Sequence, residues 1–423
     1  TITFPSGTTV VNNGSQTGFG RTGTVDWQTG SIKTATFTAA NGEGYFANTL
    51  GGAFTMNLPA GTAGNIVSVV DYTNTFQTNA LTIAPNGSQK IGGVAASQTL
   101  STEGQSVTFV YVDDTEGWKN VQDSTSNITG NPFIVATGGT ITTSGNCKIH
   151  TFTGPGTFTV VSAAVESSNN KAGYLVVAGG GGGGRVRGGG GGGGGFREGR
   201  CGPVTPYTDS PLGTSGITVS AQAYPITVGG GGSGGPGPSG CGSNSVFSTI
   251  TSTGGGGGGS PALGGGQTGG SGGGGSTFTP ASNRPGSAGN TPPVSPPQGN
   301  PGGIGKLSSP PGTAGSGGGG GATAAGGDSN TSTPITAGNG GAGATTSISG
   351  SSTTYAGGGG GSAYLSGAGG SGGSGGGGNG GQYPNNPAAT NGAANTGGGA
   401  GGDAGFTNPT GGSGIVIIRY KYQ

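Results

Sequence analysis

The stretch YLVVAGGGGGGRVRGGGGGGGGFREGR, residues 174–200, decides what kind of fold the chain can have. An apolar run passes into glycine, which is interrupted only at residues 185–187 before Phe196. The 423 residues include 112 glycines and 25 prolines, a composition that normally signals low complexity. Most of the glycines follow residue 170. The stretch is therefore a phosphate-binding loop, a flexible linker, or folded material with almost no side chains.

A phosphate-binding loop requires a glycine-rich turn followed by Lys and Ser or Thr at the start of a helix. The nearest candidate, NPGGIGKL (300–307), lacks both the first glycine and the Ser or Thr. Matches to GxGxxG are trivial within glycine runs, and here they follow no βαβ pattern. We therefore expect no nucleotide cofactor.

Glycine and serine tracts are usually flexible coils, and ordering glycine costs more backbone entropy than ordering any other residue. Polyglycine II strands offer compensation, because they have three residues per turn and no internal hydrogen bonds. Neighbouring strands can then approach closely and satisfy one another's N–H and C=O groups. We expect residues 179–413 to form such a bundle. Its inner strands should be nearly pure glycine, with mixed strands such as 338–344 outside.

The residues before the glycine runs are typical of β-strands. NIVSVVDY (65–72), ALTIAP (80–85) and QSVTFVYVD (105–113) are rich in β-branched and aromatic residues, and several alternate with period two. Asn86-Gly87 indicates a tight turn. No window shows a convincing helical period. The predicted fold class is all-β with almost no α-helix, beginning with an antiparallel β-sandwich over residues 31–124.

A second β module is expected over residues 125–178. IHTFTGPGTFTVV (149–161) predicts a hairpin, and the continuous apolar runs in GYLVVAG (173–179) and GIVIIRYKYQ (414–423) predict neighbouring buried strands that pair. The bundle at 179–413 then becomes an insertion into this module. Residues 1–30 remain as an N-terminal segment for attachment or strand exchange.

Composition excludes several classes of protein. With 14 basic and 13 acidic side chains, the net charge of +1 excludes an electrostatically driven nucleic-acid binder. No apolar run is long enough for membrane insertion, and the start, TITFPSGTTVV, lacks the features of a signal peptide. The three cysteines show no CxxC spacing and there is one histidine, so no metal site is expected. A disulfide between Cys201 and Cys241 stays open.

The segments between glycine runs should form caps and tip loops. Exposed loops with aromatic, Asn, Ser and Arg residues are typical recognition surfaces, although the aromatic residues could instead plug the bundle ends. The candidates for receptor binding are Phe196, Arg197, Tyr207, Phe278, Arg284, Tyr355 and Tyr383.

Other polar residues favour structural roles. The basic cluster Arg185, Arg187, Arg197 and Arg200 could bind acidic glycans or lipopolysaccharide phosphates, but capping of strand-end carbonyls is favoured. His150 has no partner at a useful spacing and is expected to be structural. The acidic stretch 113–116 favours a solvated turn over a calcium site. No set of side chains suggests catalysis, so we expect no enzyme and no catalytic residue.

Two parts of the chain resemble a known group of proteins. VVDYTNTFQTNALTIAPNGSQKIGG and LSTEGQSVTFVYVDDTEGWKNVQ, within residues 69–122, resemble a β-sandwich module of bacteriophage tail fibres and other appendages. IHTFTGPGTFTV, YLVVAGGGGGG and SGIVIIRY together resemble the glycine-rich domain of phage structural proteins. The resemblance implies a virion appendage with a polyglycine II bundle, whose loops bind the host surface.

That resemblance also implies partners and a location. These are a host cell-surface glycan or outer-membrane protein, other virion proteins and two further copies in a homotrimer, at the virion surface outside the cell. Two alternatives stay open. One is a purely structural filament or coat protein. The other is an ice-binding protein, which would need regularly spaced Thr or Ala that the glycine runs do not show.

Overall fold

The computed structural model describes residues 25–124 and 133–422, apart from 165, 202–206, 236–238, 262–263, 278–282, 308–312, 333, 366, 385–386 and 406. The chain divides into two compact units, Thr1–Thr129 and Gly130–Gln423. The predicted N-terminal segment 1–30 lies outside the described residues except for 25–30. The all-β prediction is confirmed: within the described ranges there is no α-helix, and one 3-10 turn, η1, spans Ser167–Asn170. Accordingly, no described helix could cross a membrane.

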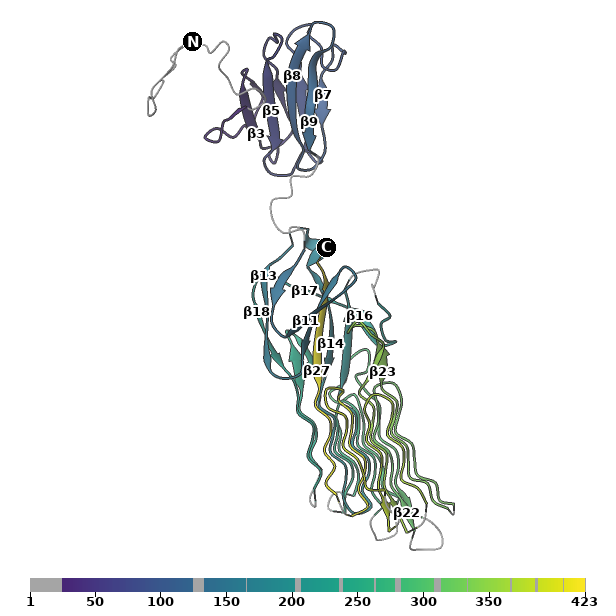
Figure 1. Cartoon of the computed structure of the whole chain (residues 1–423). Helices are drawn as coiled ribbons and strands as arrows, with labels where there is room; N and C mark the ends of the chain where they lie inside the picture. Colours follow the sequence, from purple (N-terminus) through teal and green to yellow (C-terminus); the bar gives the residue numbers. More distant parts are fainter. Residues whose placement is uncertain are drawn as a thin grey trace, which may run out of the picture. The chain divides into compact units, whose positions relative to one another are not determined.

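Unit 1 is a sandwich of two sheets (Figure 1). One sheet has the order β1 (Asp26–Trp27), β3 (Glu43–Ala47), β5 (Ile66–Asp71), β8 (Ser106–Asp113) and β9 (Gly117–Ser124). The other has the order β2 (Phe37–Thr38), β4 (Phe54–Asn57), β6 (Leu81–Ala84) and β7 (Gln98–Leu100). Their facing side chains, among them Met56, Val69, Phe109 and Trp118, form one hydrophobic core.

The prediction of a sandwich is correct, but the prediction that it is antiparallel is wrong for its first half. From β1 to β6 the chain alternates between the two sheets. Each strand therefore lies beside the strand two before it and runs in the same direction, so β1–β3, β3–β5, β2–β4 and β4–β6 are parallel pairs. Only the pairs β5–β8, β8–β9 and β6–β7 are antiparallel.

Unit 2 begins with two sheets that enclose a second core. One has the order β11 (Thr140–Ser144), β12 (Cys147–Phe152), β27 (Ile415–Lys421), β14 (Lys171–Val177), β15 (Phe196–Arg200) and β16 (Gly213–Ser215), with β17 (Ile217–Thr218) also on β14. The other has the order β10 (Val135–Thr137), β13 (Gly156–Ser162), β18 (Ala223–Thr227), β19 (Ser245–Phe247) and β20 (Ile250–Ser252). Phe158, Tyr174, Phe247 and Ile418 pack between them.

The predicted pairing of the two apolar runs is confirmed. β14 and β27 are antiparallel neighbours, with Val177 opposite Ile415. The chain therefore leaves this sheet for the glycine region and returns to it at adjacent positions. The predicted 149–161 hairpin is wrong, because β12 is flanked by β11 and β27 while β13 pairs in the other sheet. The turn near Pro155 thus carries the chain from one sheet to the other.

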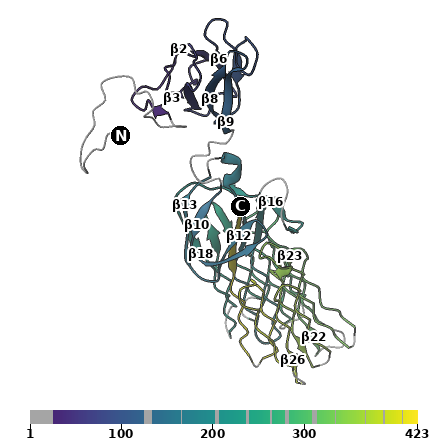
Figure 2. The same ribbon diagram turned by 45° about the horizontal axis from the view of Figure 1, so that its top comes forward.

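The glycine-rich segments run side by side as a bundle of extended strands (Figures 1 and 2). Their hydrogen bonds repeat every three residues. In 179–184, the N–H groups of Gly179 and Gly182 donate to Ser243 and Gly240, and those of Gly180 and Gly183 donate to 412 and 409. Residues 181 and 184 donate to 192 and 189. Three partner strands in strict rotation are what an extended helix with three residues per turn requires.

The strand 188–195 lies at the centre of the bundle and consists only of glycine. Its N–H groups donate in rotation to 397–403, 253–259 and 317–320. Its carbonyl groups accept bonds from 178–184, 271–274 and 359–362. Each of the six neighbours thus bonds directly to a strand without side chains, so the core here is made of backbone.

The close approach explains why glycine is required inside the bundle. A Cβ atom on Gly191 would lie 2.2 Å from the carbonyl oxygen of Gly181, whereas one on Gly230, in an outer strand, would meet nothing within 4 Å. The expected sorting of strands holds only in part, because Ser271 and Ala400 are fully buried in strands that bond to the central one. In the mixed strand 338–344, Asn339 is exposed and Ala342 is half-exposed.

Short β-ladders hold the ends of the bundle strands together. Near the sheets, β23 (Ala344–Thr346) and β24 (Thr353–Tyr355) form a hairpin. At the opposite end is a four-stranded ladder with the order β21 (Lys306–Leu307), β22 (Ala314–Gly315), β25 (Ala363–Tyr364) and β26 (Gln382–Tyr383) (Figure 1).

Candidate functional site

The bundle has one end at the sheets and one end away from them. We call the second end the tip and define it by the described residues 185–187, 283–284, 304–307, 328–332, 334–336, 364–365, 367, 383–384, 403–405 and 407–408. Residues 185–187 form a turn there, because Gly184 N–H donates to Gly189 O across it at 2.9 Å. The tip is where the extended strands end and ordinary side chains resume.

Three side chains from distant parts of the sequence form a stack at the tip. The guanidinium carbon of Arg187 lies 3.8 Å from the centre of the Tyr364 ring. The Tyr364 and Tyr383 rings are 4.9 Å apart and inclined by only 6°. Tyr364 lies opposite Tyr383 in the β25–β26 pair, which fixes the two rings face to face. All three residues are half-buried, so part of the stack faces solvent.

The backbone under this stack is held in a fixed turn. Val186 and Arg187 have φ angles of 55° and 58°, in the left-handed region that L residues rarely adopt. The carbonyl of Arg187 accepts bonds from the Ser316 hydroxyl at 2.6 Å and from Thr277 N–H at 3.4 Å. Leu365, next to Tyr364, also has a positive φ of 66° and is 45% exposed. Turn and ladder together present an arginine, two tyrosines and a leucine at one end of the bundle.

Among the described tip residues, Asp328 and Asp403 have polar partners, whereas three arginines take part in no ion pair. Lys306 pairs with Asp328 at 2.8 Å. The Asp403 carboxylate accepts bonds from Thr407 N–H and its hydroxyl. Among described residues, the tip arginines Arg185, Arg187 and Arg284 take part in no ion pair. The tip therefore presents arginine side chains that an anionic partner could engage.

Four of the sequence-predicted binding residues lie at the sheet end instead. Phe196 and Tyr355 are only 1% and 4% exposed and belong to a core beneath the bundle, which corrects their assignment as receptor contacts. Each borders a glycine run and marks the return to a side-chain core. Tyr207 is half-buried with the Arg419 guanidinium 4.8 Å from its ring centre. Arg197 is half-buried in β15.

The remaining predicted residues belong to the other end. Tyr383 and Arg284 lie at the tip, whereas Phe278 is outside the described residues. Sequence reasoning missed Tyr364, and it weighed anion binding by the basic cluster that includes Arg187 but favoured capping of strand-end carbonyls. The available signal was position, because Arg187 directly precedes one glycine run and Tyr364 lies three residues after another.

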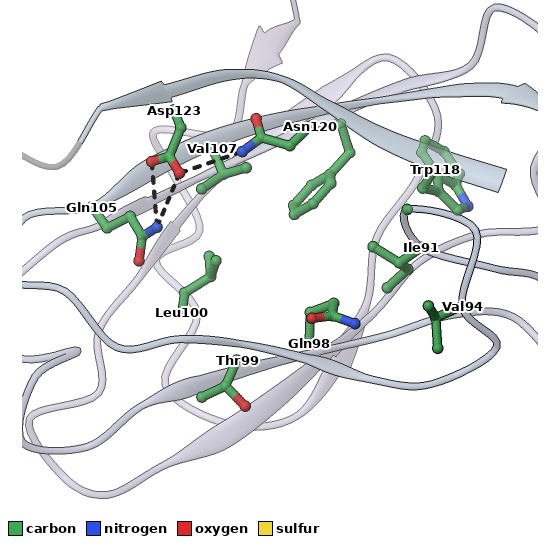
Figure 3. Close-up of a pocket in the computed structure, with 12 residues that line it drawn as sticks. Ile91, Val94, Gln98, Thr99, Leu100, Gln105, Val107, Trp118, Asn120 and Asp123 are labelled. Atoms are coloured by element: carbon green, nitrogen blue, oxygen red, sulfur yellow. Dashed lines mark hydrogen bonds between the residues drawn. The ribbon is translucent and has the colours of Figure 1, made fainter. Parts of the chain in front are cut away.

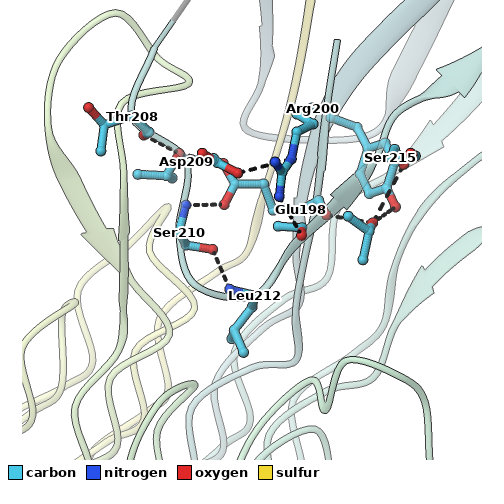
Figure 4. Close-up of polar contacts among 11 residues, drawn as sticks. Glu198, Arg200, Thr208, Asp209, Ser210, Leu212 and Ser215 are labelled. Atoms are coloured by element: carbon cyan, nitrogen blue, oxygen red, sulfur yellow. Dashed lines mark hydrogen bonds and ion pairs between the residues drawn. The ribbon is translucent and has the colours of Figure 1, made fainter. Parts of the chain in front are cut away.

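A buried carboxylate lies at the sheet end, on β15 (Figure 4). Glu198 is 1% exposed and accepts bonds from Ser210 N–H at 2.9 Å and from the Thr346 hydroxyl. Burial raises the pKa of Glu198, and the two hydrogen bonds oppose that rise. Next to it Arg200 pairs with Asp209 at 3.1 Å. These contacts fasten the loop around Ser210 to β15 and β23, which indicates a structural role.

Unit 1 contains a groove of about 490 Å³ between β7 and β9 (Figure 3). Its apolar lining includes Leu100, Val107 and Trp118. On the polar side, Gln105 and Asn120 each donate to the Asp123 carboxylate at 3.3 Å. Gln105, Asn120 and Asp123 thus satisfy one another, whereas the buried Trp118 Nε1 has no hydrogen-bond partner among the described residues. The described lining contains no Lys or Arg, so the groove makes a weaker case for an anionic ligand than the tip.

The residues expected to be structural have clear structural partners. His150 is fully buried, with Nδ1 2.7 Å from Gly138 O and Nε2 3.0 Å from the Tyr420 hydroxyl. Burial lowers the pKa of His150. In the acidic turn, Asp113 accepts bonds from the N–H groups of residues 115 and 116. The described residues contain no cluster of metal-ligating side chains.

The class that these observations define is a glycine-rich β protein, in which a two-sheet module carries a backbone-cored bundle. Residues 151–421 match the glycine-rich domain family, and the chain belongs to that family. The matched region runs from β12 to β27, so it contains the strands that begin and end the excursion as well as the bundle itself. Comparison with curated proteins finds no match.

Proposed function

We propose that this chain is an appendage protein of a bacteriophage particle, a tail fibre or adhesin, that binds the bacterial surface through the tip of its bundle. The Arg187–Tyr364–Tyr383 stack is the observation that carries the proposal. In this stack two tyrosine rings pack against an arginine that takes part in no ion pair among the described residues, and the stack lies at the end of the backbone-cored bundle. The sequence resemblance to phage appendages supports the same role.

The chemistry of the tip favours an anionic glycan as the ligand. Guanidinium groups bind carboxylate and phosphate oxygens with directed hydrogen bonds, and tyrosine supplies rigid contact area together with a hydroxyl group. The described tip offers both in one place. Other virion proteins and further copies of the chain in a trimer complete the proposed setting, outside the cell.

The experiment is binding of fluorescently labelled full-length protein to intact cells of a panel of bacterial strains. We expect Arg187→Ala and Tyr383→Ala each to weaken binding to a recognised strain by about tenfold or more, as for central contact residues. Arg197→Ala, at the sheet end, and Tyr72→Ala, an exposed tyrosine of unit 1, are the matched controls.

The proposal fails if both tip variants bind as well as the wild-type protein. Absence of binding to every strain tested would instead favour a purely structural filament. Rising salt should also weaken binding by the wild-type protein, because exposed charge pairs are screened.

A further inference from the structure

Two cysteines lie on one face of the sheet that carries the bundle, although they are far apart in the sequence. Cys147 begins β12 and Cys201 directly follows β15, with β27 and β14 between those strands. None of the three cysteines is in a disulfide. Cys241, which the sequence left as a possible partner of Cys201, is exposed and donates to Gln267 Oε1 at 2.9 Å. The neighbour of Cys201 is therefore Cys147 and not Cys241.

The register of the sheet explains how Cys201 reaches towards Cys147 although two strands, β27 and β14, lie between β12 and β15. Arg419 lies opposite both Ile149 and Gly173, so the side chains of these positions share one face with that of Cys147, two residues from Ile149. Because Gly173 has no side chain, the chain after β15 can fold over it. A Cβ on Gly173 would lie 3.0 Å from Cys201 N and 3.4 Å from its Cβ. Cys201 therefore lies over Gly173, on the face of the sheet that carries Cys147, and the hydrogen bond between the two thiols acts on the pKa of both.

A buried cation adjoins this pair. Arg419 is 2% exposed and donates to Ile348 O at 3.2 Å and to Ser144 O at 3.4 Å. It also contacts the Cys147 thiol. The hydrogen bond from Cys201, followed by that from Arg419, holds the pKa of Cys147 below its ordinary value, against the effect of burial. The same bond and burial raise the pKa of Cys201. Of the two thiols, Cys147 is therefore the one that ionises more readily.

We propose that Cys147 and Cys201 form a disulfide when the protein meets a peroxide, fastening the chain after β15 onto the face of β12. The Cys147 thiolate attacks one oxygen of hydrogen peroxide, giving a sulfenic acid on Cys147 and releasing hydroxide. The Cys201 sulfur then attacks the Cys147 sulfur, the S–O bond breaks, and water leaves with the Cys201 proton. The released hydroxide takes up the proton that Cys147 lost on ionising, so in total two thiols are oxidised to one disulfide while one peroxide is reduced to two waters.

This step suits the environment of the pair. The nucleophile in such oxidation is the thiolate, and a neighbouring cation favours it. Cys147 is only 2% exposed, so a molecule as small as hydrogen peroxide is the appropriate oxidant. Cys201 is half-exposed and continues into the segment that leads to Tyr207.

The test treats reduced full-length protein with hydrogen peroxide and counts thiols after unfolding. We expect the count to fall from three to one, with a non-reducing peptide map joining the peptides of Cys147 and Cys201. Cys241→Ser is the control and should fall from two thiols to none. In Cys201→Ser, a sulfenic-acid reagent should label Cys147 because the second thiol is missing.

A map that joins Cys201 to Cys241, or that leaves Cys147 reduced while Cys241 is oxidised, would overturn the proposal. The wild-type map decides the matter even if a variant fails to fold. The outcome is independent of any binding by the tip.

Discussion

Replacing Gly191 by alanine adds a single methyl group at the centre of the bundle. The new Cβ would lie 2.2 Å from Gly181 O, 2.7 Å from Gly181 C and 2.9 Å from Gly182 O. Ordinary contact begins near 3.4 Å, so the strand 179–184 must move away by about 1 Å. That movement stretches the 2.8 Å bond from Gly181 N–H to Gly192 O.

Two costs add in this variant. Overpacking of a tight interior costs about 1–3 kcal/mol, and a buried backbone group that loses its partner costs about another 1–3 kcal/mol. The expected loss is therefore about 2–6 kcal/mol, which for a unit of about 300 residues lowers Tm by about 3–10 °C. Gly230→Ala is the matched control, because its Cβ meets nothing within 4 Å. It should leave Tm unchanged or slightly raised, since alanine restricts the unfolded chain.

Scanning calorimetry of the full-length protein measures both variants, with attention to the transition that includes the bundle. A large fall for Gly191→Ala with none for Gly230→Ala is the expected result. Equal melting temperatures for the two variants would refute the argument that the interior is made of backbone in contact.

Further substitutions test the sheet end and its charges. Burial raises the pKa of Glu198 above its ordinary value of 4.5, so the stabilising contribution of the neutral form is complete below that pH and is lost as pH rises through the folded pKa. Above pH 4.5, the Tm of Glu198→Gln should therefore rise progressively relative to that of the wild-type protein. A Tm difference that does not change with pH would argue against this. The lowered pKa of His150 also makes stability depend on pH, but this effect is the same in both proteins and cancels in the difference. Ile417→Ala, at a 1% exposed position of β27, should cost about 2–5 kcal/mol in chemical denaturation, whereas the exposed Val161→Ala should change stability by less than about 1 kcal/mol. Similar losses at the two positions would contradict the placement of β27 in the core.

The sequence predicted the features that depend on local composition. Apolar runs at 173–179 and 414–423 could be recognised as buried strands. Because both are continuous apolar runs, they were predicted to be neighbours, and β14 and β27 do pair. The glycine runs predicted the extended strands. In these cases the residues themselves carry the structural information, through side-chain burial or through the absence of side chains.

Other features depend on which distant segments meet. The alternation in β12 and β13 identifies strands but not their partners, so a crossover between sheets was mistaken for a hairpin. The parallel pairs of unit 1 arise from the path of the chain between two sheets. The tip stack joins residues 187, 364 and 383, and only the bundle's hydrogen-bond register brings them together. Aromatic residues beside glycine runs were predicted to be exposed. One of the two ends of the bundle meets the sheets, however, and there Phe196 and Tyr355 are buried.

Backbone hydrogen exchange of the full-length protein, measured with and without cells of a recognised strain, tests the central claim most directly. We expect protection confined to the tip, at 185–187, 364–367 and 383–384, with none at Phe196–Arg200 or Thr353–Tyr355. Protection at the sheet end or in unit 1 with an unchanged tip would contradict the claim that the bundle holds the binding residues at its far end.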